Sequence, residues 1–220
     1  VVDGTGSPAV RADVAVVGNR IQAVGACLEE PAAEIIEADG LVITPGFIDI
    51  HTHTDGSVFA NPAVTSKLLQ GVTADVTGNC GIGAFPVNSL RQELLADYLK
   101  MHDFTNPPEG LVWENFSQYA ERLEQLPLGV NLIPLVGHGA LRIAVMGAEE
   151  REPTAEELSA MCRLLDEAMA QGAWGCSTGL IYPPGSFAKT KELIALAKVS
   201  AKYQGLYSSH IRGESSTLMA

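Results

Sequence analysis

The sequence has no long apolar segment and no excess of basic residues. No stretch approaches the ~18 consecutive apolar residues of a membrane-spanning helix, and the first residues lack the basic and apolar regions of a secretory signal peptide. Lysine and arginine number 14 against 26 aspartates and glutamates, a formal charge of -12. This balance argues against a surface for nucleic acid or anionic membranes. We therefore expect a cytoplasmic protein without nucleic-acid or membrane partners.

Cysteine is also scarce. The four cysteines, Cys27, Cys80, Cys162 and Cys176, stand singly, with no CxxC pair. Because the disulfide framework of small secreted proteins is missing, we expect reduced thiols, any special one being metal-bound or reactive. Hydrophobic residues, by contrast, make up 46% of the chain and charged residues only 18%. That composition suits a globular chain with a sizeable core.

The residue pattern divides the sequence into two consecutive regions. In residues 1–41, strand-like segments at 13–17 and 20–24 flank a glycine–asparagine turn, which favours a hairpin, and a further strand-like segment follows at 33–38. Residues 42–220 alternate short apolar runs with helix-period segments, the pattern of βα units and a parallel sheet. We expect part of a small β-sandwich domain first and a βα region second.

The βα region contains five candidate units. The number of residues per unit matches a (β/α)8 (TIM) barrel, whose eight units typically need ~250 residues. Three units would then be missing. A doubly wound sheet gives the same alternation, but its glycine-rich phosphate loop is absent after the first strand. We therefore expect an incomplete barrel. Strands are predicted at 47–50, 73–77, 131–136, 172–177 and 206–209, and helices at 62–70, 89–102, 113–125, 154–171 and 190–203.

Two histidines stand at the end of the first predicted strand. Side chains at i and i+2 of a strand point the same way, so His51 and His53 can offer two imidazoles to one ion. Barrel active sites lie at this end of the strands, and imidazole suits Zn²⁺. The alternative is a polar strand end without a metal.

A cysteine stands in a glycine-bracketed turn after the second predicted strand. The run GNCG occupies residues 78–81, and its glycines allow close approach of the backbone to a ligand. A thiolate at Cys80 would be a strong Zn²⁺ ligand. The alternative is that Cys80 is a small buried hydrophobic residue.

These motifs carry a resemblance to a known family. The run ITPGFIDIHTHTD at 43–55, after a small β segment, resembles the opening of the amidohydrolase superfamily, whose first barrel strand ends in His-x-His. The GNCG run is similar to the D-aminoacylase (N-acyl-D-amino-acid deacylase) branch, in which a cysteine binds metal where other branches use a carboxylated lysine on strand four. Residues 173–179 contain no lysine; Cys176 lies there, and we expect it to be a packing residue.

The resemblance implies a zinc-dependent hydrolase that cleaves the amide bond of N-acyl-D-amino acids to a carboxylate and a D-amino acid. His210, at the end of the fifth predicted strand, matches the superfamily's metal histidine on strand five. Cys80 and His210 would then hold a tight zinc, and His51 and His53 would face a second, weaker position. All four residues gathering on one ion is the alternative.

The same resemblance implies residues on the substrate side. Tyr182, in a proline-stiffened loop, matches a tyrosine that contacts substrate in the family, although it could instead pack on neighbouring prolines. His138 is expected to bind substrate or to shape the site, with Arg142 and Arg212 as possible partners of a substrate carboxylate. His102 is expected to be a solvated surface residue.

The family also uses a histidine on strand six and a general-base aspartate on strand eight, which would lie downstream of residue 220. The sequence starts at Val1 without a methionine, and we expect truncation at both ends and an inactive fragment. Hydantoinase, dihydroorotase and dipeptidase branches are rivals, against which Cys80 and the missing lysine argue. A further alternative is a metal-free relative that acts only as a binding protein.

Overall fold

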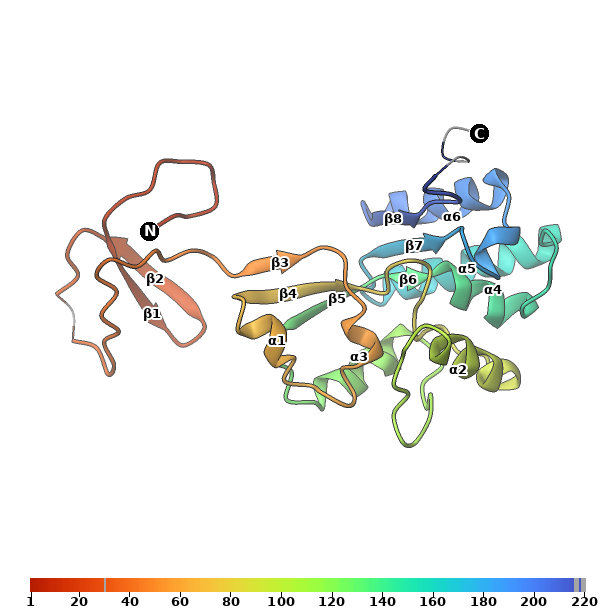
Figure 1. The fold of residues 1–220 in the computed structure, drawn as a ribbon, viewed down its shortest axis with the longest axis horizontal. Helices are drawn as coiled ribbons and strands as arrows, with labels where there is room; N and C mark the ends of the chain where they lie inside the picture. Colours follow the sequence, from red (N-terminus) through yellow and green to blue (C-terminus); the bar gives the residue numbers. More distant parts are fainter. Residues whose placement is uncertain (30, 216–217, 219–220) are drawn as a thin grey trace. The chain divides into compact units, whose positions relative to one another are not determined.

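A computed structural model of the chain describes residues 1–29, 31–215 and 218. The chain divides into two compact units, Val1–Phe47 and Ile48–Ala220 (Figure 1). The last residues of the predicted βα region, 216, 217, 219 and 220, lie outside the described residues. Within the described part of the chain, no helix combines the length and the apolar character needed to cross a bilayer.

The first unit contains the predicted hairpin. Strand β1 (Asp13–Val17) pairs with strand β2 (Arg20–Gly25) in antiparallel orientation, with Val14 opposite Val24. The segment 33–38 is not a strand, and Ile35 and Ile36 are 75% and 81% exposed. A strand must pair its backbone groups with a neighbour, and this segment has no such partner among the described residues.

The strands of the second unit form two three-stranded sheets with orders β3-β4-β5 and β6-β7-β8. Strand β4 pairs in parallel with β5, and β7 pairs in parallel with both β6 and β8. Only Leu135 separates β5 from β6, so the single strand predicted at 131–136 is divided between the two sheets. The strands are β3 (Phe47–Asp49), β4 (Val72–Thr77), β5 (Asn131–Pro134), β6 (Val136–Gly137), β7 (Gly175–Gly179) and β8 (Leu206–His210).

Five helices form within the predicted helical segments, and one was not predicted. Eight of the nine residues of α4 (His138–Met146) are buried, so this helix has no polar face and lacks the amphipathic period that marks a surface helix. Short 3-10 turns occupy Thr54–Gly56, Ser89–Arg91 and Gly185–Phe187. The predicted helices are α1 (Thr65–Leu68), α2 (Gln92–Lys100), α3 (Phe116–Glu124), α5 (Ala155–Ala170) and α6 (Thr190–Lys202).

The start of α5 shows the predicted capping box. The amide of Glu157 donates to Oγ1 of Thr154 at 3.2 Å, and the amide of Thr154 donates to Oε2 of Glu157 at 2.8 Å. These two bonds satisfy backbone donors that the first turn of a helix leaves without partners. The capping box therefore fixes where α5 begins.

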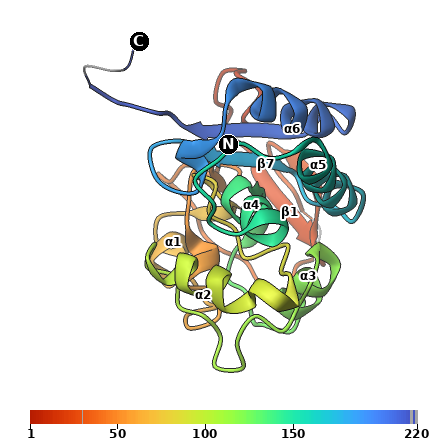
Figure 2. The ribbon, with the colours of Figure 1, turned by 90° about the vertical axis from the view of Figure 1, so that its right-hand side faces the viewer.

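The core lies between the helices and the strands. Helix α5 packs against both α4 and α6, and α4 and α6 both contact β7 (Figures 1 and 2). Leu141, Leu165 and Leu196, one from each helix, are fully buried, and truncating such a leucine to alanine costs about 2–5 kcal/mol. This packing holds β7 in place, and with it the segments that follow the strands.

Candidate metal centre

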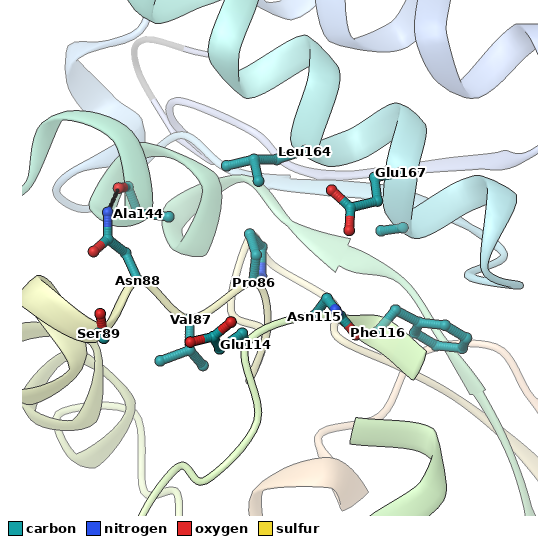
Figure 3. A pocket seen from close by; sticks show the side chains of 11 residues that line it. Pro86, Val87, Asn88, Ser89, Glu114, Asn115, Phe116, Ala144, Leu164 and Glu167 are labelled. Atoms are coloured by element: carbon teal, nitrogen blue, oxygen red, sulfur yellow. Dashed lines mark hydrogen bonds between the residues drawn. The ribbon is translucent and has the colours of Figure 1, made fainter. Parts of the chain in front are cut away.

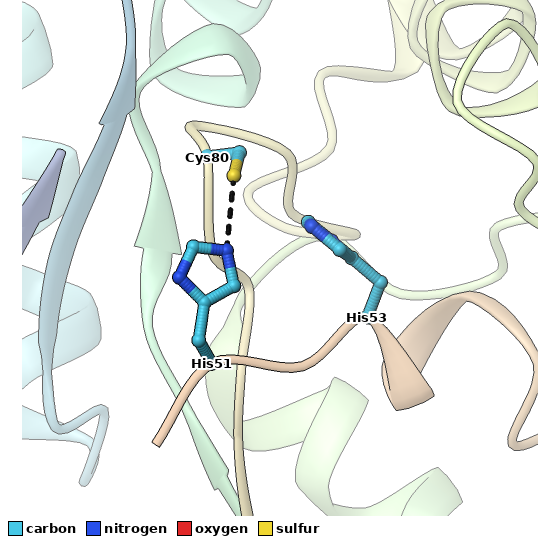
Figure 4. Close-up of side chains that lie close together, drawn as sticks. All are labelled: His51, His53 and Cys80. Atoms are coloured by element: carbon cyan, nitrogen blue, oxygen red, sulfur yellow. Dashed lines mark hydrogen bonds between the residues drawn. The ribbon is translucent and has the colours of Figure 1, made fainter. Parts of the chain in front are cut away.

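Three ligand-type side chains converge where β3 and β4 end. His51 and His53 follow β3 directly, and Cys80 follows β4. Figure 4 shows the two imidazoles and the thiol turned toward one another. One ligand atom from each of the three residues lies within 4.8 Å of the other two, and Nε2 of His51 lies 3.2 Å from Sγ of Cys80. The structure thus brings together three of the four predicted metal residues.

His210 is not brought into this group. It ends β8, its Nε2 lies 3.2 Å from Oε1 of Glu214, and its ring centroid lies 5.6 Å from that of Tyr182. Among the described residues, the close group of ligand atoms consists of His51, His53 and Cys80. The role of His210 as a metal ligand therefore remains a prediction.

The surroundings of His53 favour its neutral form. Partial desolvation lowers the pKa of His53, and the charges of His51, His102 and His210 lower it further. A histidine must be neutral to donate a ring nitrogen to a metal. The electrostatics of the cluster therefore suit metal binding.

Cys80 lies in a tightly packed turn, residues 78–81, which we call the Cys80 turn. Cys80 itself has a left-handed backbone conformation, with φ of 56°. A Cβ atom added at Gly78 would lie 2.2 Å from the carbonyl oxygen of Leu135, and one added at Gly81 would lie 2.6 Å from the amide nitrogen of Gly179. Glycine at these two positions therefore lets the turn pack against the segment between β5 and β6 and against β7.

Tyr182 lies beside the Cys80 turn. Its hydroxyl donates a hydrogen bond to the carbonyl oxygen of Cys80. Its ring centroid lies 4.7 Å from that of His102 and 5.6 Å from that of His210. The residue is half-buried between these two imidazoles. The loop after β7 therefore reaches the same place as the ends of β3 and β4.

The expectation of a solvated His102 was wrong. His102 is partly buried, and its ring centroid lies 4.9 Å from that of Tyr98. Burial lowers the pKa of His102. His102 follows the end of α2, four residues after Tyr98, a spacing at which side chains on successive helical turns are neighbours. The four-residue spacing from Tyr98 is the sequence signal that could have indicated the partial burial of His102.

His138 lies in a buried ionic network rather than at an open surface. It is 0% exposed, and its Nε2 lies 2.7 Å from Oε1 of Glu192 in α6. Nη1 of Arg142 donates to both oxygens of Glu192 at 2.9 and 2.8 Å. Burial raises the pKa of Glu192, but the hydrogen bonds and charges of His138 and Arg142 outweigh it, so the net shift is downward. A substrate contact of His138 remains a prediction.

The remaining sequence candidates have structural partners. Arg212 donates to the backbone carbonyls of Ser186 and Ala188 at 3.2 and 2.5 Å. Cys176 is fully buried in the hydrophobic core, and burial raises the pKa of its thiol to about 12. Such a thiol is inert. Cys176 is therefore the packing residue that we expected.

Figure 3 shows a pocket of about 340 Å³ whose lining does not include His51, His53 or Cys80. It is lined by residues of the loop at 86–89 and by residues of α3, α4 and α5, and Nδ2 of Asn88 donates to the carbonyl of Ala144 at 2.8 Å. None of the predicted site residues lines it. The candidate site lies at the ends of β3 and β4, where ligand-type side chains converge.

These observations define an α/β protein with a candidate metal centre at the ends of its strands. A family model described as the amidohydrolase family matches residues 34–216. The chain belongs to the amidohydrolase family.

Curated relatives match nearly the whole chain. N-acyl-D-aspartate deacylase of Alcaligenes xylosoxydans xylosoxydans is 42% identical over 214 residues, which are 97% of this chain and 42% of that protein. D-aminoacylase of the same organism is 39% identical over 219 residues, 100% of this chain and 44% of that protein. The chain therefore spans less than half the length of these relatives.

Solved structures agree in fold. N-acyl-D-glutamate deacylase from Bordetella bronchiseptica, complexed with zinc and a phosphonate inhibitor, matches with a TM-score of 0.86 and 39% identity over 96% of this chain and 43% of that one. A D-aminoacylase described with a binuclear metal centre matches with a TM-score of 0.83 and 41% identity, over 96% of this chain and 44% of that one. The fold is therefore the amidohydrolase fold of these enzymes.

Proposed function

We propose that the chain is the N-terminal part of a zinc-dependent hydrolase that cleaves the amide bond of N-acyl-D-amino acids. The products are a carboxylate and a D-amino acid. The observation that carries this proposal is the convergence of His51, His53 and Cys80 within 4.8 Å. The chain is 42% identical to an N-acyl-D-aspartate deacylase, 39% identical to an N-acyl-D-glutamate deacylase and 39% identical to a D-aminoacylase. The proposal therefore names the class of substrate that they share.

The proposed fold is an incomplete (β/α)8 barrel of the metal-dependent hydrolase type. Residues 1–41 would be part of a small β-sandwich domain, and residues 42–220 would supply the first five βα units. The parallel pairing of the strands supports this proposal. Ile48 in β3 and Leu206 in β8 are 61% and 48% exposed, so further strands packed beside β3 and β8 would bury them. The rest of the full-length protein would then close the barrel and contribute the general base.

The residues present fit zinc. Two imidazoles and a thiol are the nitrogen and sulfur donors that Zn²⁺ prefers, and its sites have three or four protein ligands. We propose His51, His53 and Cys80 as ligands, joined by His210. In this arrangement Cys80 and His210 hold a tight site, and His51 and His53 face a second, weaker one. The binuclear centre of the related D-aminoacylase supports the second position.

When bound, zinc supplies a Lewis acid that activates water and polarises the scissile carbonyl. The chain's own residues orient the reactants. Tyr182, beside Cys80 and His210, is the side chain we propose to contact the substrate. We also propose that His138, whose Nε2 lies 2.7 Å from Oε1 of Glu192, binds the substrate or shapes the site.

The test is an assay of the full-length protein on N-acetyl derivatives of D-aspartate, D-glutamate and D-methionine and on their L counterparts. We expect hydrolysis of at least one D substrate, loss of activity after chelation and recovery with zinc. Cleavage of hydantoin or dihydroorotate instead would assign the chain to a cyclic-amide branch. Zinc-free protein without hydrolytic activity would indicate a binding protein.

A further inference from the structure

A single serine side chain joins the two ends of the Cys80 turn. The hydroxyl of Ser177 in β7 accepts a hydrogen bond from the amide of Gly81 at 2.9 Å and donates one to the carbonyl oxygen of Gly78. Ser177 is 0% exposed. Its partners lie 96 and 99 residues earlier in the chain, on either side of Cys80. Ser177 therefore fixes the path of the backbone that carries the candidate ligand.

The backbone at Cys80 needs such support. A residue with a side chain in the left-handed region is strained and persists only where its surroundings hold it there. Four other side chains reach this segment, each at one position: Tyr182 at the Cys80 carbonyl, Tyr98 at the Gly81 carbonyl, Asp55 at the Gly78 amide and Ser208 at the Asn79 side chain. Of these five side chains, only Ser177 bonds to both ends of the turn.

The position of the turn decides where the thiol points. Sγ of Cys80 lies 3.2 Å from Nε2 of His51, so a small change in the turn would move the sulfur out of reach of the imidazoles. Residues that orient a ligand from behind typically affect metal affinity by about 10–100-fold. The hydroxyl of Ser177 lies behind the turn, in β7, and not among the ligand atoms.

We infer that Ser177 is a positioning residue for Cys80: its hydroxyl preorganises the Cys80 turn so that the thiol faces His51 and His53 before a metal binds. The inference rests on the proposed zinc site. It assigns Ser177 no contact with metal or substrate. Its effect is exerted through the backbone of residues 78–81.

The first test compares zinc affinity in the full-length protein for wild type, Ser177→Ala and Ser200→Ala, by competition with a chelator. Ser200 is the matched control because it is also buried, at 1% exposure, and its hydroxyl donates to a backbone carbonyl, that of Leu206, at 3.3 Å. We expect Ser177→Ala to bind zinc about 10–100-fold more weakly and Ser200→Ala to keep wild-type affinity. Wild-type affinity in Ser177→Ala would overturn the inference.

A second test uses only the wild-type protein, so it does not depend on whether a variant folds. In metal-free wild-type protein, hydrogen exchange at the Gly81 amide should be slow, because its proton is bonded to a buried hydroxyl. Exchange at the rate of an unstructured peptide would overturn the inference. A wild-type protein that binds no zinc would overturn the proposed function, so the two failures are told apart by the wild type alone.

Discussion

Nε2 of His51 lies 3.2 Å from Sγ of Cys80, although 29 residues separate them in the chain. His51 follows β3 and Cys80 follows β4, and these two strands are neighbours in one sheet. The contact therefore results from strand pairing, which brings the ends of sequential βα units together. Any change that alters the Cys80 turn should act on metal binding before it acts on the fold.

Replacing Tyr182 by phenylalanine should lower hydrolysis of the N-acyl-D-amino acid about tenfold, the effect of losing one hydrogen bond of about 1–1.5 kcal/mol. Zinc content should be retained, because Tyr182 is not a proposed ligand and the hydroxyl of Ser177 still bonds to both ends of the Cys80 turn. Steady-state kinetics and elemental analysis measure the two effects. Tyr203→Phe is the control, since that hydroxyl bonds to the carbonyl of Asp166 in α5. Equal activity of both variants and wild type would remove Tyr182 from the site.

The capping box of α5 should make the stability of the protein depend on pH in the acidic range. Hydrogen bonding to Arg151, and then to the amide of Thr154, lowers the pKa of Glu157 from 4.5 to about 2. A lowered folded-state pKa contributes stability that is full above pH 4.5 and is lost as pH falls toward 2. The melting temperature of Glu157→Gln should therefore lie below that of wild type at neutral pH, and the gap should narrow below pH 4.5.

Two controls accompany this prediction. Glu156→Gln, one residue earlier in the same first turn, should show no such narrowing. Thr154→Ala should lower the free energy of unfolding by about 1 kcal/mol, the typical value of an N-cap. A gap between wild type and Glu157→Gln that stays constant with pH would contradict the account.

Glu192→Gln should destabilise the protein strongly. The substitution leaves the guanidinium of Arg142 buried without its carboxylate partner, and breaking a buried pair from one side costs about 3–5 kcal/mol. Asp166→Asn breaks an exposed pair with Lys202 and should cost less than about 1 kcal/mol. Chemical denaturation of the two variants measures the difference. Equal losses would show that the Glu192 pair is not desolvated.

Much of the fold follows from the sequence because periodicity and capping are local signals. The hairpin, the strand preceding His51 and the start of α5 at Thr154 were all predicted from such signals. Helix α4 was missed because burial on all sides removes its polar face. The break at Leu135 was missed because a change of sheet partner depends on strands far away in the chain.

The candidate site was partly predictable for the same reason. His51, His53 and Cys80 end predicted strands, so their convergence followed from the expectation of a parallel sheet. Glu192 and Ser177 were missed, since their partners lie about 50 to 100 residues away in sequence and neither residue carries a motif. Side chains that position a metal ligand through contacts distant in the sequence are not marked by a local sequence motif.

We propose that Cys80 is a zinc ligand of an N-acyl-D-amino-acid hydrolase. The most direct measurement is zinc stoichiometry by elemental analysis of the full-length protein, for wild type, Cys80→Ala and the control Cys162→Ala, a partly buried cysteine of α5. We predict that Cys80→Ala loses zinc together with hydrolysis of N-acyl-D-methionine, while Cys162→Ala keeps both. Unchanged zinc and activity in Cys80→Ala would contradict the account.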